Sequence, residues 1–130
     1  MHSNSTRATA VLFLRARSLG RDNPDQEQHI IAAQRASCVR TAETLGAEVI
    51  REYVEYGGTA SIDTRPTLRL MLDELRALRD TTYIIVTNHD RLVRRSRDAA
   101  YISLEIEAVG AELITATSVV HTKDRKEVTV

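Results

Sequence analysis

Arginine side chains gather at two points of the sequence where they could bind a phosphate group. Arg15 ends one apolar stretch, and Arg91 and Arg94 follow closely after another. Guanidinium groups donate paired hydrogen bonds to phosphate oxygens, so converging arginines bind such a group strongly. Hydroxyl groups lie in neighbouring polar segments, at Ser18 and Thr59. The pattern therefore predicts an arginine-based site for phosphoryl chemistry.

Other kinds of catalytic site are not indicated by the sequence. It holds no acidic cluster suited to Mg²⁺ and no glycine-rich phosphate loop with a lysine. Metal-ligand spacing is lacking among the histidines, which are His2, His29, His89 and His121. Cys38 is the only cysteine and is expected to pack within a helix. We therefore expect neither a metal ion nor another cofactor.

The composition is that of a globular chain whose charges balance. Of 130 residues, 42% are hydrophobic and 28% charged, with 18 Lys and Arg against 18 Asp and Glu. This length suits one domain, and the balance argues against nucleic-acid binding through bulk charge while allowing a local basic site. The single cysteine, the polar start and the lack of an apolar run of ~20 residues predict a cytoplasmic protein with no membrane partner.

Strands and helices should alternate along the chain and position the arginines. Strands are expected over 8–15, 47–54, 82–87 and 111–116, and helices over 24–45, from 66, and after the charged turn 88–97 until before Gly110. The alternation predicts an α/β fold, a single three-layer domain with a mostly parallel sheet of four to five strands and helices on both faces. Sheets of this kind bind ligands beyond the carboxyl ends of their strands. Arg15 and Arg91 would meet there.

Helical spacing also predicts which side chains are buried. In the first helix the expected apolar face comprises Ile30, Ala33, Ala36, Ser37, Val39, Ala42 and Leu45. In the second helix it comprises Leu68, Met71, Leu72, Leu75 and Leu78. The last segment, 119–130, has two β-rich pieces around a charged turn, which allows either a hairpin or a tail.

Several motifs resemble, in order, the catalytic domain of serine site-specific recombinases of the resolvase/invertase kind. The opening FLRARS at 13–18 is similar to the family's aromatic, any residue, Arg, small apolar residue and nucleophilic Ser. Across residues 8–118 the further similarities are Gln34 ahead of LGAEV at 45–49, EYGGTA at 55–60, RPTL at 65–68, YIIV at 83–86, DRLVR at 90–94 and GAEL at 110–113. The order and spacing of the motifs make the resemblance specific.

The resemblance implies a resolvase-like fold that cleaves and exchanges DNA strands through a phosphoserine link. Covalent catalysis of this type retains the bond energy and needs no cofactor. Ser18 is then the candidate nucleophile, while Arg15, Arg65, Arg91 and Arg94 stabilise charge on the phosphoryl oxygens. Asp90 would orient Arg91 or assist proton movement. The resemblance also indicates phosphate- or DNA-binding positions at Arg65, Thr59, Arg17 and Gln34. Of these, Gln34 is better assigned to packing or positioning.

The chain departs from the family at the nucleophile position itself. That position lies two residues after Arg15 and holds Arg17, with Ser18 one step later. A one-residue step along a strand reverses the side-chain direction, although a bulged loop could present Ser18. Two hypotheses follow: an active recombinase domain, or a catalytically dead dimerisation or regulatory module. A third, an unrelated α/β phosphate-binding domain, would be favoured if Arg15, Arg91 and Arg94 lay far apart. Arg15 could also simply pair with Glu55 or Asp90.

The resemblance also implies partners. DNA is the expected partner, bound weakly by this domain alone because no DNA-binding module resembling the family's follows residue 118. We expect one domain over residues 1–130 that forms a homodimer or tetramer, or a heteromer with a full-length recombinase. The choice among resolution, inversion and integration stays open.

Overall fold

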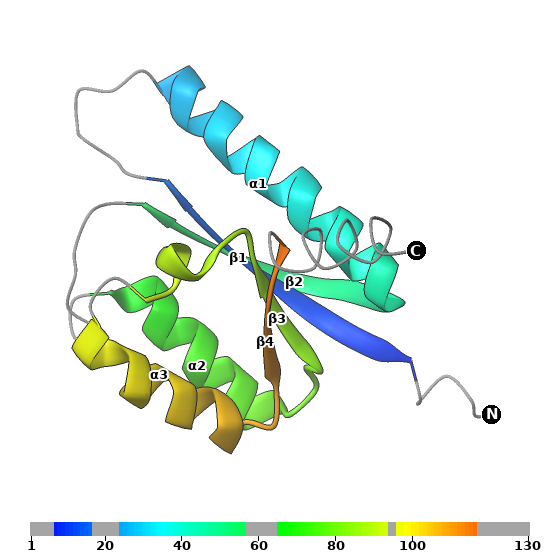
Figure 1. Cartoon of the computed structure of the whole chain (residues 1–130), viewed down its shortest axis with the longest axis vertical. Helices are drawn as coiled ribbons and strands as arrows, with labels where there is room; N and C mark the ends of the chain where they lie inside the picture. The colour runs from blue at the N-terminus through cyan, green and yellow to red at the C-terminus, as the bar shows by residue number, and fades with distance from the viewer. Residues whose placement is uncertain (1–6, 17–23, 57–64, 94–95, 117–130) are drawn as a thin grey trace, which may run out of the picture.

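The computed structural model describes residues 7–16, 24–56, 65–93 and 96–116. Within them, helices and strands alternate along the chain (Figure 1). The elements are β1 (Ala8–Ala16), α1 (Pro24–Leu45), β2 (Ala47–Tyr56), α2 (Pro66–Leu78), β3 (Tyr83–Val86), η3 (His89–Arg91), α3 (Ser96–Ala108) and β4 (Glu112–Thr115). The strands form one sheet in the order β2-β1-β3-β4, and every pairing is parallel. The predicted α/β class is confirmed.

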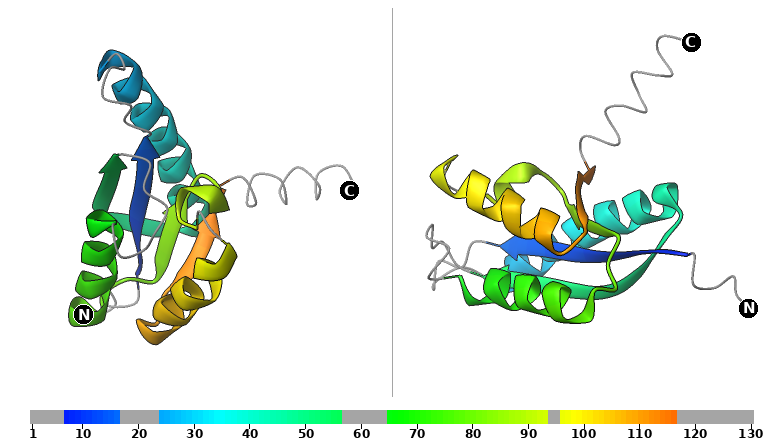
Figure 2. Two further views of the ribbon diagram at one scale, coloured as in Figure 1. Left: turned by 90° about the vertical axis from the view of Figure 1, so that its left-hand side faces the viewer. Right: turned by 90° about the horizontal axis from the view of Figure 1, so that it is seen from below.

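The three layers arise from the alternation of side chains along β1. Val11 and Phe13 pack with α2 and α3, whereas Leu12 and Leu14 pack with α1. Successive side chains of a strand point to opposite faces, so a central strand covered by helices on both sides is apolar throughout. Figures 1 and 2 show α1 on one face of the sheet and α2 and α3 on the other.

Local signals in the sequence fix the ends of the helices. α1 begins at Pro24, as predicted, and is followed by Gly46, whose φ of +71° lies in the left-handed region that favours glycine. Gly110, with φ of +79°, follows α3 in the same way. α2 begins at Pro66, which places Arg65 just before its first turn. Arg65 therefore lies beside the sheet, at the point where the chain enters α2.

The predicted buried face of α1 is wrong for part of its length. Ile30 is 38% exposed and Ala33 and Ala36 are also exposed. The buried side chains are instead Ile31, Gln34, Cys38, Thr41 and Ala42. Apolar residues occur on two sides of this helix, and the side that packs is the one that carries Gln34 against β1.

The predicted face of α2 is confirmed apart from its last residue. Leu68, Met71, Leu72 and Leu75 are buried, whereas Leu78 is 53% exposed. Leu78 ends the helix, so the chain turns away before this side chain reaches the core.

Residues 119–130, for which the sequence allows a hairpin or a tail, lie outside the described residues. None of the helices in the described ranges is both long enough and apolar enough to cross a membrane.

Candidate phosphate-binding site

The carboxyl ends of β1 and β2 bring a buried arginine next to a buried glutamate. Arg15 and Glu55 are partners in the parallel register of the two strands. Both are buried, with 4% and 5% of their surface exposed, and Arg15 Nε donates to Glu55 Oε1 at 3.0 Å. Because the loops of a parallel sheet gather at this edge, the ion pair lies where ligands of such folds bind.

Arg65 joins the same carboxylate from the start of α2. Its Nε donates to Glu55 Oε2 at 2.9 Å and its Nη2 to Glu55 Oε1 at 2.8 Å. Its Nη1 donates to the carbonyl oxygen of Leu92 at 2.6 Å, and Nη2 reaches that of Arg91 at 3.3 Å. The guanidinium also lies 5.9 Å from the centre of the Phe13 ring. Arg65 thereby links the ends of two strands to the segment after β3.

Gln34 holds the main chain of Arg15 from α1. Its Oε1 accepts the Arg15 backbone N–H at 3.0 Å, and its Nε2 donates to the Arg15 carbonyl at 2.6 Å. This buried amide therefore satisfies both main-chain groups of one strand residue, as a neighbouring strand would. The sequence placed Gln34 at a phosphate- or DNA-binding position and favoured packing or positioning for it. These contacts support positioning.

The η3 turn places Asp90 and Arg91 beside this cluster. The side-chain oxygen of Asn88 accepts a hydrogen bond from the Asp90 N–H at 3.0 Å, and the main-chain carbonyl of Asn88 accepts one from the Arg91 N–H at 3.1 Å. Asp90 is exposed, whereas Arg91 is half-buried. Within the described ranges, Arg91 Nε is buried without a hydrogen-bond partner.

Among the described residues that build this cluster and the adjoining η3 turn, guanidiniums outnumber carboxylates. The guanidiniums are Arg15, Arg65 and Arg91, and the carboxylates are Glu55 and Asp90. An excess of guanidinium over carboxylate attracts an anion such as phosphate. The other predicted site residues, Arg17, Ser18, Thr59 and Arg94, lie outside the described residues.

The sequence indicates Glu55 as the first residue of the EYGGTA motif and as a possible partner of Arg15. The structure adds that it pairs with Arg65 as well. A signal for the Arg15 contact was available: each of these two parallel strands has a charged residue next to its carboxyl end, and the register sets the opposite charges side by side. The contact with Arg65 had no such signal, because it depends on how α2 packs.

Neither a metal cluster nor a reactive thiol emerges from the described part of the chain. No group of three or more His, Cys, Asp or Glu is placed there to hold a metal ion. Cys38 is buried, its Sγ donates to the carbonyl of Ile85 at 3.8 Å, and burial raises its pKa to about 12. These facts agree with the packing role predicted for Cys38.

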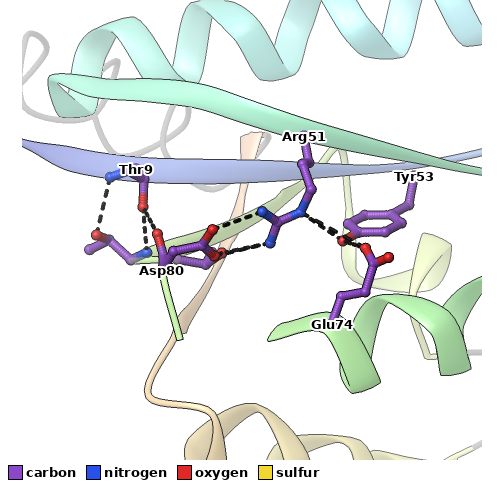
Figure 3. Close-up of polar contacts among 7 residues, drawn as sticks. Thr9, Arg51, Tyr53, Glu74 and Asp80 are labelled. Atoms are coloured by element: carbon purple, nitrogen blue, oxygen red, sulfur yellow. Dashed lines mark hydrogen bonds and ion pairs between the residues drawn. The ribbon is translucent and has the colours of Figure 1, made fainter. Parts of the chain in front are cut away.

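A second polar network lies at the opposite edge of the sheet (Figure 3). Arg51 donates from Nη1 and Nη2 to the two carboxylate oxygens of Asp80, at 2.9 and 3.0 Å, and from Nε to the Tyr53 hydroxyl at 2.9 Å. Tyr53 donates onward to Glu74 at 2.6 Å, and Thr9 donates to the Asp80 carbonyl.

This second network shifts pKa values without forming an anion site. The hydrogen bonds from Arg51 hold the pKa of Asp80 below its usual value. Burial is the main cause of a raised pKa at Tyr53. Arg51 is matched by the carboxylates of Asp80 and Glu74, so the network joins β2, α2 and the start of β3 as a structural contact.

Comparison with known proteins agrees with the fold and the motifs. The family model described as "Resolvase, N terminal domain" matches residues 19–129. No curated protein matches this chain in sequence.

Solved structures show the same architecture at low sequence identity. The C-terminal catalytic domain of ISC1926 TnpA, an IS607-like serine recombinase, has a TM-score of 0.68 at 19% identity, over 83% of this chain and 67% of that chain. The N-terminal catalytic domain of TP901-1 integrase has a TM-score of 0.62 at 18% identity, over 83% and 78% of the two chains. A resolvase family site-specific recombinase from Streptococcus pneumoniae has a TM-score of 0.64 at 18% identity, over 93% and 91%.

Proposed function

Because this chain belongs to the family of resolvase N-terminal domains, we propose that it is a serine recombinase catalytic domain that acts on a DNA phosphodiester. The observation that carries the proposal is the buried cluster at the carboxyl edge of the sheet in which Glu55, itself paired with Arg65, holds Arg15 in place. A guanidinium group held in advance stabilises the charge that develops on phosphoryl oxygens, without reorganisation during the reaction.

The proposed reaction needs a hydroxyl group, and Ser18 is the candidate. Its oxygen would form a bond to phosphorus while the bond from phosphorus to the 3′ oxygen breaks. The serine proton is lost, and the leaving 3′ oxygen gains a proton. Arg15 and Arg91 would stabilise the negative phosphoryl oxygens, and Asp90 would orient Arg91 or assist proton movement. Thr59 and Arg94 would line the same site.

A second function is favoured by the residue at the family's nucleophile position. Arg17 stands there, which points to a catalytically dead module that dimerises with, or regulates, a full-length recombinase. The arginine cluster would then bind DNA or maintain the fold without cleaving a strand.

A suicide DNA substrate distinguishes the two functions. Such a duplex carries a nick that lets the freed end diffuse away, so a covalent protein–DNA adduct accumulates. Because the DNA target is not specified by the sequence, the substrate is a pool of nicked duplexes of random sequence. The protein is compared with Ser18→Ala, Arg17→Ser and Arg17→Ala variants, and adducts are detected as slower bands on a denaturing gel.

The adduct pattern decides between the two functions. An active domain gives an adduct that Ser18→Ala abolishes. A dead module gives no adduct from the natural chain and gains one with Arg17→Ser but not with Arg17→Ala. If no variant forms an adduct, the proposed cleavage activity is contradicted.

The assembly and location of the protein are part of the same proposal. We expect weak DNA binding by this domain alone, a homodimer or tetramer or a heteromer with a full-length recombinase, and a cytoplasmic location. Analytical ultracentrifugation with and without DNA measures the mass of the assembly. Sedimentation only as a monomer in both conditions would contradict the homo-oligomer.

A further inference from the structure

We propose that Arg65 is a positioning residue, which sets the geometry of Glu55 and of the η3 turn and does not itself bind phosphate. Its effect on DNA rests on the proposed function; its effect on the turn does not. The sequence motif placed Arg65 among the phosphate-binding residues, but its contacts in the structure favour this different role.

The hydrogen-bond donors of Arg65 are already used by protein acceptors. A guanidinium has five N–H donors in a fixed fork. Four of them are directed at the two oxygens of Glu55 and the carbonyls of Leu92 and Arg91. The residue is 1% exposed and its guanidinium lies against the Phe13 ring, so a phosphate could reach it only by displacing these contacts.

The contacts show what Arg65 positions. The two carbonyls belong to the end of η3 and the residue after it, and the carboxylate belongs to the end of β2. One rigid guanidinium group therefore fixes the distance between Glu55 and the turn that carries Arg91. Because Glu55 also accepts a hydrogen bond from Arg15, the same guanidinium group orients the carboxylate that holds Arg15.

The charges point to the same division of roles. Glu55 is shared between Arg15 and Arg65, and the bidentate pair with Arg65 takes both of its oxygens. Arg65 and Glu55 thus largely compensate each other, and the excess positive charge of the edge belongs to Arg15 and Arg91. We therefore assign contact with an anion to Arg15 and Arg91 and not to Arg65.

Nuclear magnetic resonance of the arginine side chains tests the role directly. The ¹⁵N-labelled protein is titrated with a short DNA duplex, and the Nε–H signals of Arg65 and Arg91 are followed. We expect the Arg91 signal to shift with saturation, whereas the Arg65 signal keeps its position to within a small fraction of that shift. An Arg65 shift as large as that of Arg91, with direct transfer from the DNA ³¹P nuclei to its N–H groups, would overturn the proposal.

A lysine substitution tests the positioning role of the Arg65 guanidinium group without DNA. Arg65→Lys keeps the positive charge but cannot make four directed hydrogen bonds. Arg76→Lys is the matched control, because Arg76 lies in α2, the helix that Arg65 precedes, and its side chain is 48% exposed in an ion pair with Glu105. Hydrogen exchange of the Arg91 amide, which donates to Asn88, is measured relative to the Ile85 amide in the central sheet.

The ratio of the two exchange rates separates a local from a global effect. We expect Arg65→Lys to raise it about tenfold or more, since several buried hydrogen bonds to a charged group are lost, and Arg76→Lys to leave it unchanged. An unchanged ratio in Arg65→Lys would overturn the proposal. If the protein bound no DNA at all while this ratio rose, the proposed function would fail and the positioning role would stand.

Discussion

Glu55 is the residue on which the arrangement of the arginines depends most. Its carboxylate lies between two buried guanidiniums, at 3.0 Å from Arg15 Nε and 2.8 Å from Arg65 Nη2. A buried charge without a partner is far more costly than the intact pair is favourable. Glu55 therefore matters for stability as well as for any site built on these arginines.

Replacing Glu55 with glutamine should destabilise the protein strongly. Glu55→Gln removes the carboxylate charge that the buried Arg15 and Arg65 share, and we expect the free energy of unfolding to fall by about 3–5 kcal/mol. Urea unfolding followed by circular dichroism measures this change. Glu48→Gln, at an exposed position of the same strand, should change stability by less than about 0.5 kcal/mol. Equal effects of the two substitutions would show that the buried pair is not the cause.

The Cys38 thiol should be almost unreactive in the folded protein. Burial raises its pKa from 9.0 to about 12, so the thiolate fraction at neutral pH is lowered roughly a thousandfold. Reaction with a chromogenic disulfide reagent should be slow for the native chain and rapid in urea. Rapid labelling of the native protein would contradict the packing of Cys38 against β3.

Asp80 should contribute an acid-sensitive part of the stability. Its pKa is lower in the folded chain than the usual 3.8, because Arg51 donates hydrogen bonds to it. This contribution to stability is complete above the pKa of Asp80 in the unfolded chain, and it is lost as the pH falls through the lower pKa of Asp80 in the folded chain. The carboxylate is 41% exposed, so solvent screening limits the effect to about 1 kcal/mol or less. Asp80→Asn should therefore be less stable than the natural chain at pH 6, and urea unfolding at pH 6 and below pH 3 should show the difference shrinking toward zero. A constant difference would contradict the ion pair.

Helix α1 shows where sequence patterns predict an element and where they fail. Its limits, Pro24 and Leu45, were predicted from a proline start and a glycine stop, which act locally. Its buried face was partly missed because Gln34 is polar, and a polar residue counts against burial in an apolar pattern. The amide is buried because it exchanges two hydrogen bonds with the main-chain N–H and C=O of Arg15 in β1, a contact that depends on how the helix packs on the sheet.

The Gln34 contact predicts a large effect from a substitution that conserves volume. Gln34→Leu removes the hydrogen bonds that Gln34 makes with the buried Arg15 N–H and carbonyl, at about 1–3 kcal/mol for each bond lost. Urea unfolding should show this loss, and exchange of the Arg15 amide should become faster. Gln28→Leu, at an exposed position of the same helix, is the control and should change neither. Slow exchange of the Arg15 amide in Gln34→Leu would contradict the contact.

The same contrast applies to the candidate site. The order of strands and helices placed Arg15 and Arg91 at one edge of the sheet, because loops after parallel strands converge there. The sequence could not show that the N–H groups of Arg65 donate to acceptors within the protein, because these contacts depend on α2 lying within reach of η3. The positions of Arg17, Ser18, Thr59 and Arg94 remain predictions from the motif.

For the whole molecule, the proposed binding of DNA must come from local and not from total charge. The chain has 18 basic and 18 acidic side chains, so its net charge gives little long-range attraction for DNA. The two polar clusters of the described residues differ: Arg51 near the amino edge is matched by carboxylates, whereas guanidiniums outnumber carboxylates in the cluster at the carboxyl edge. The structure thus predicts one preferred face for DNA.

The measurement that tests this account most directly is the salt dependence of DNA affinity. Binding of a short duplex is measured by fluorescence anisotropy at several salt concentrations for the natural chain, Arg91→Gln and Arg79→Gln, the last at an exposed position near the amino edge. Each lost phosphate contact reduces the slope of log affinity against log salt by about one. We predict that reduction for Arg91→Gln and an unchanged slope for Arg79→Gln. Equal slopes for all three proteins, or a reduction only in Arg79→Gln, would contradict a phosphate site at the carboxyl edge.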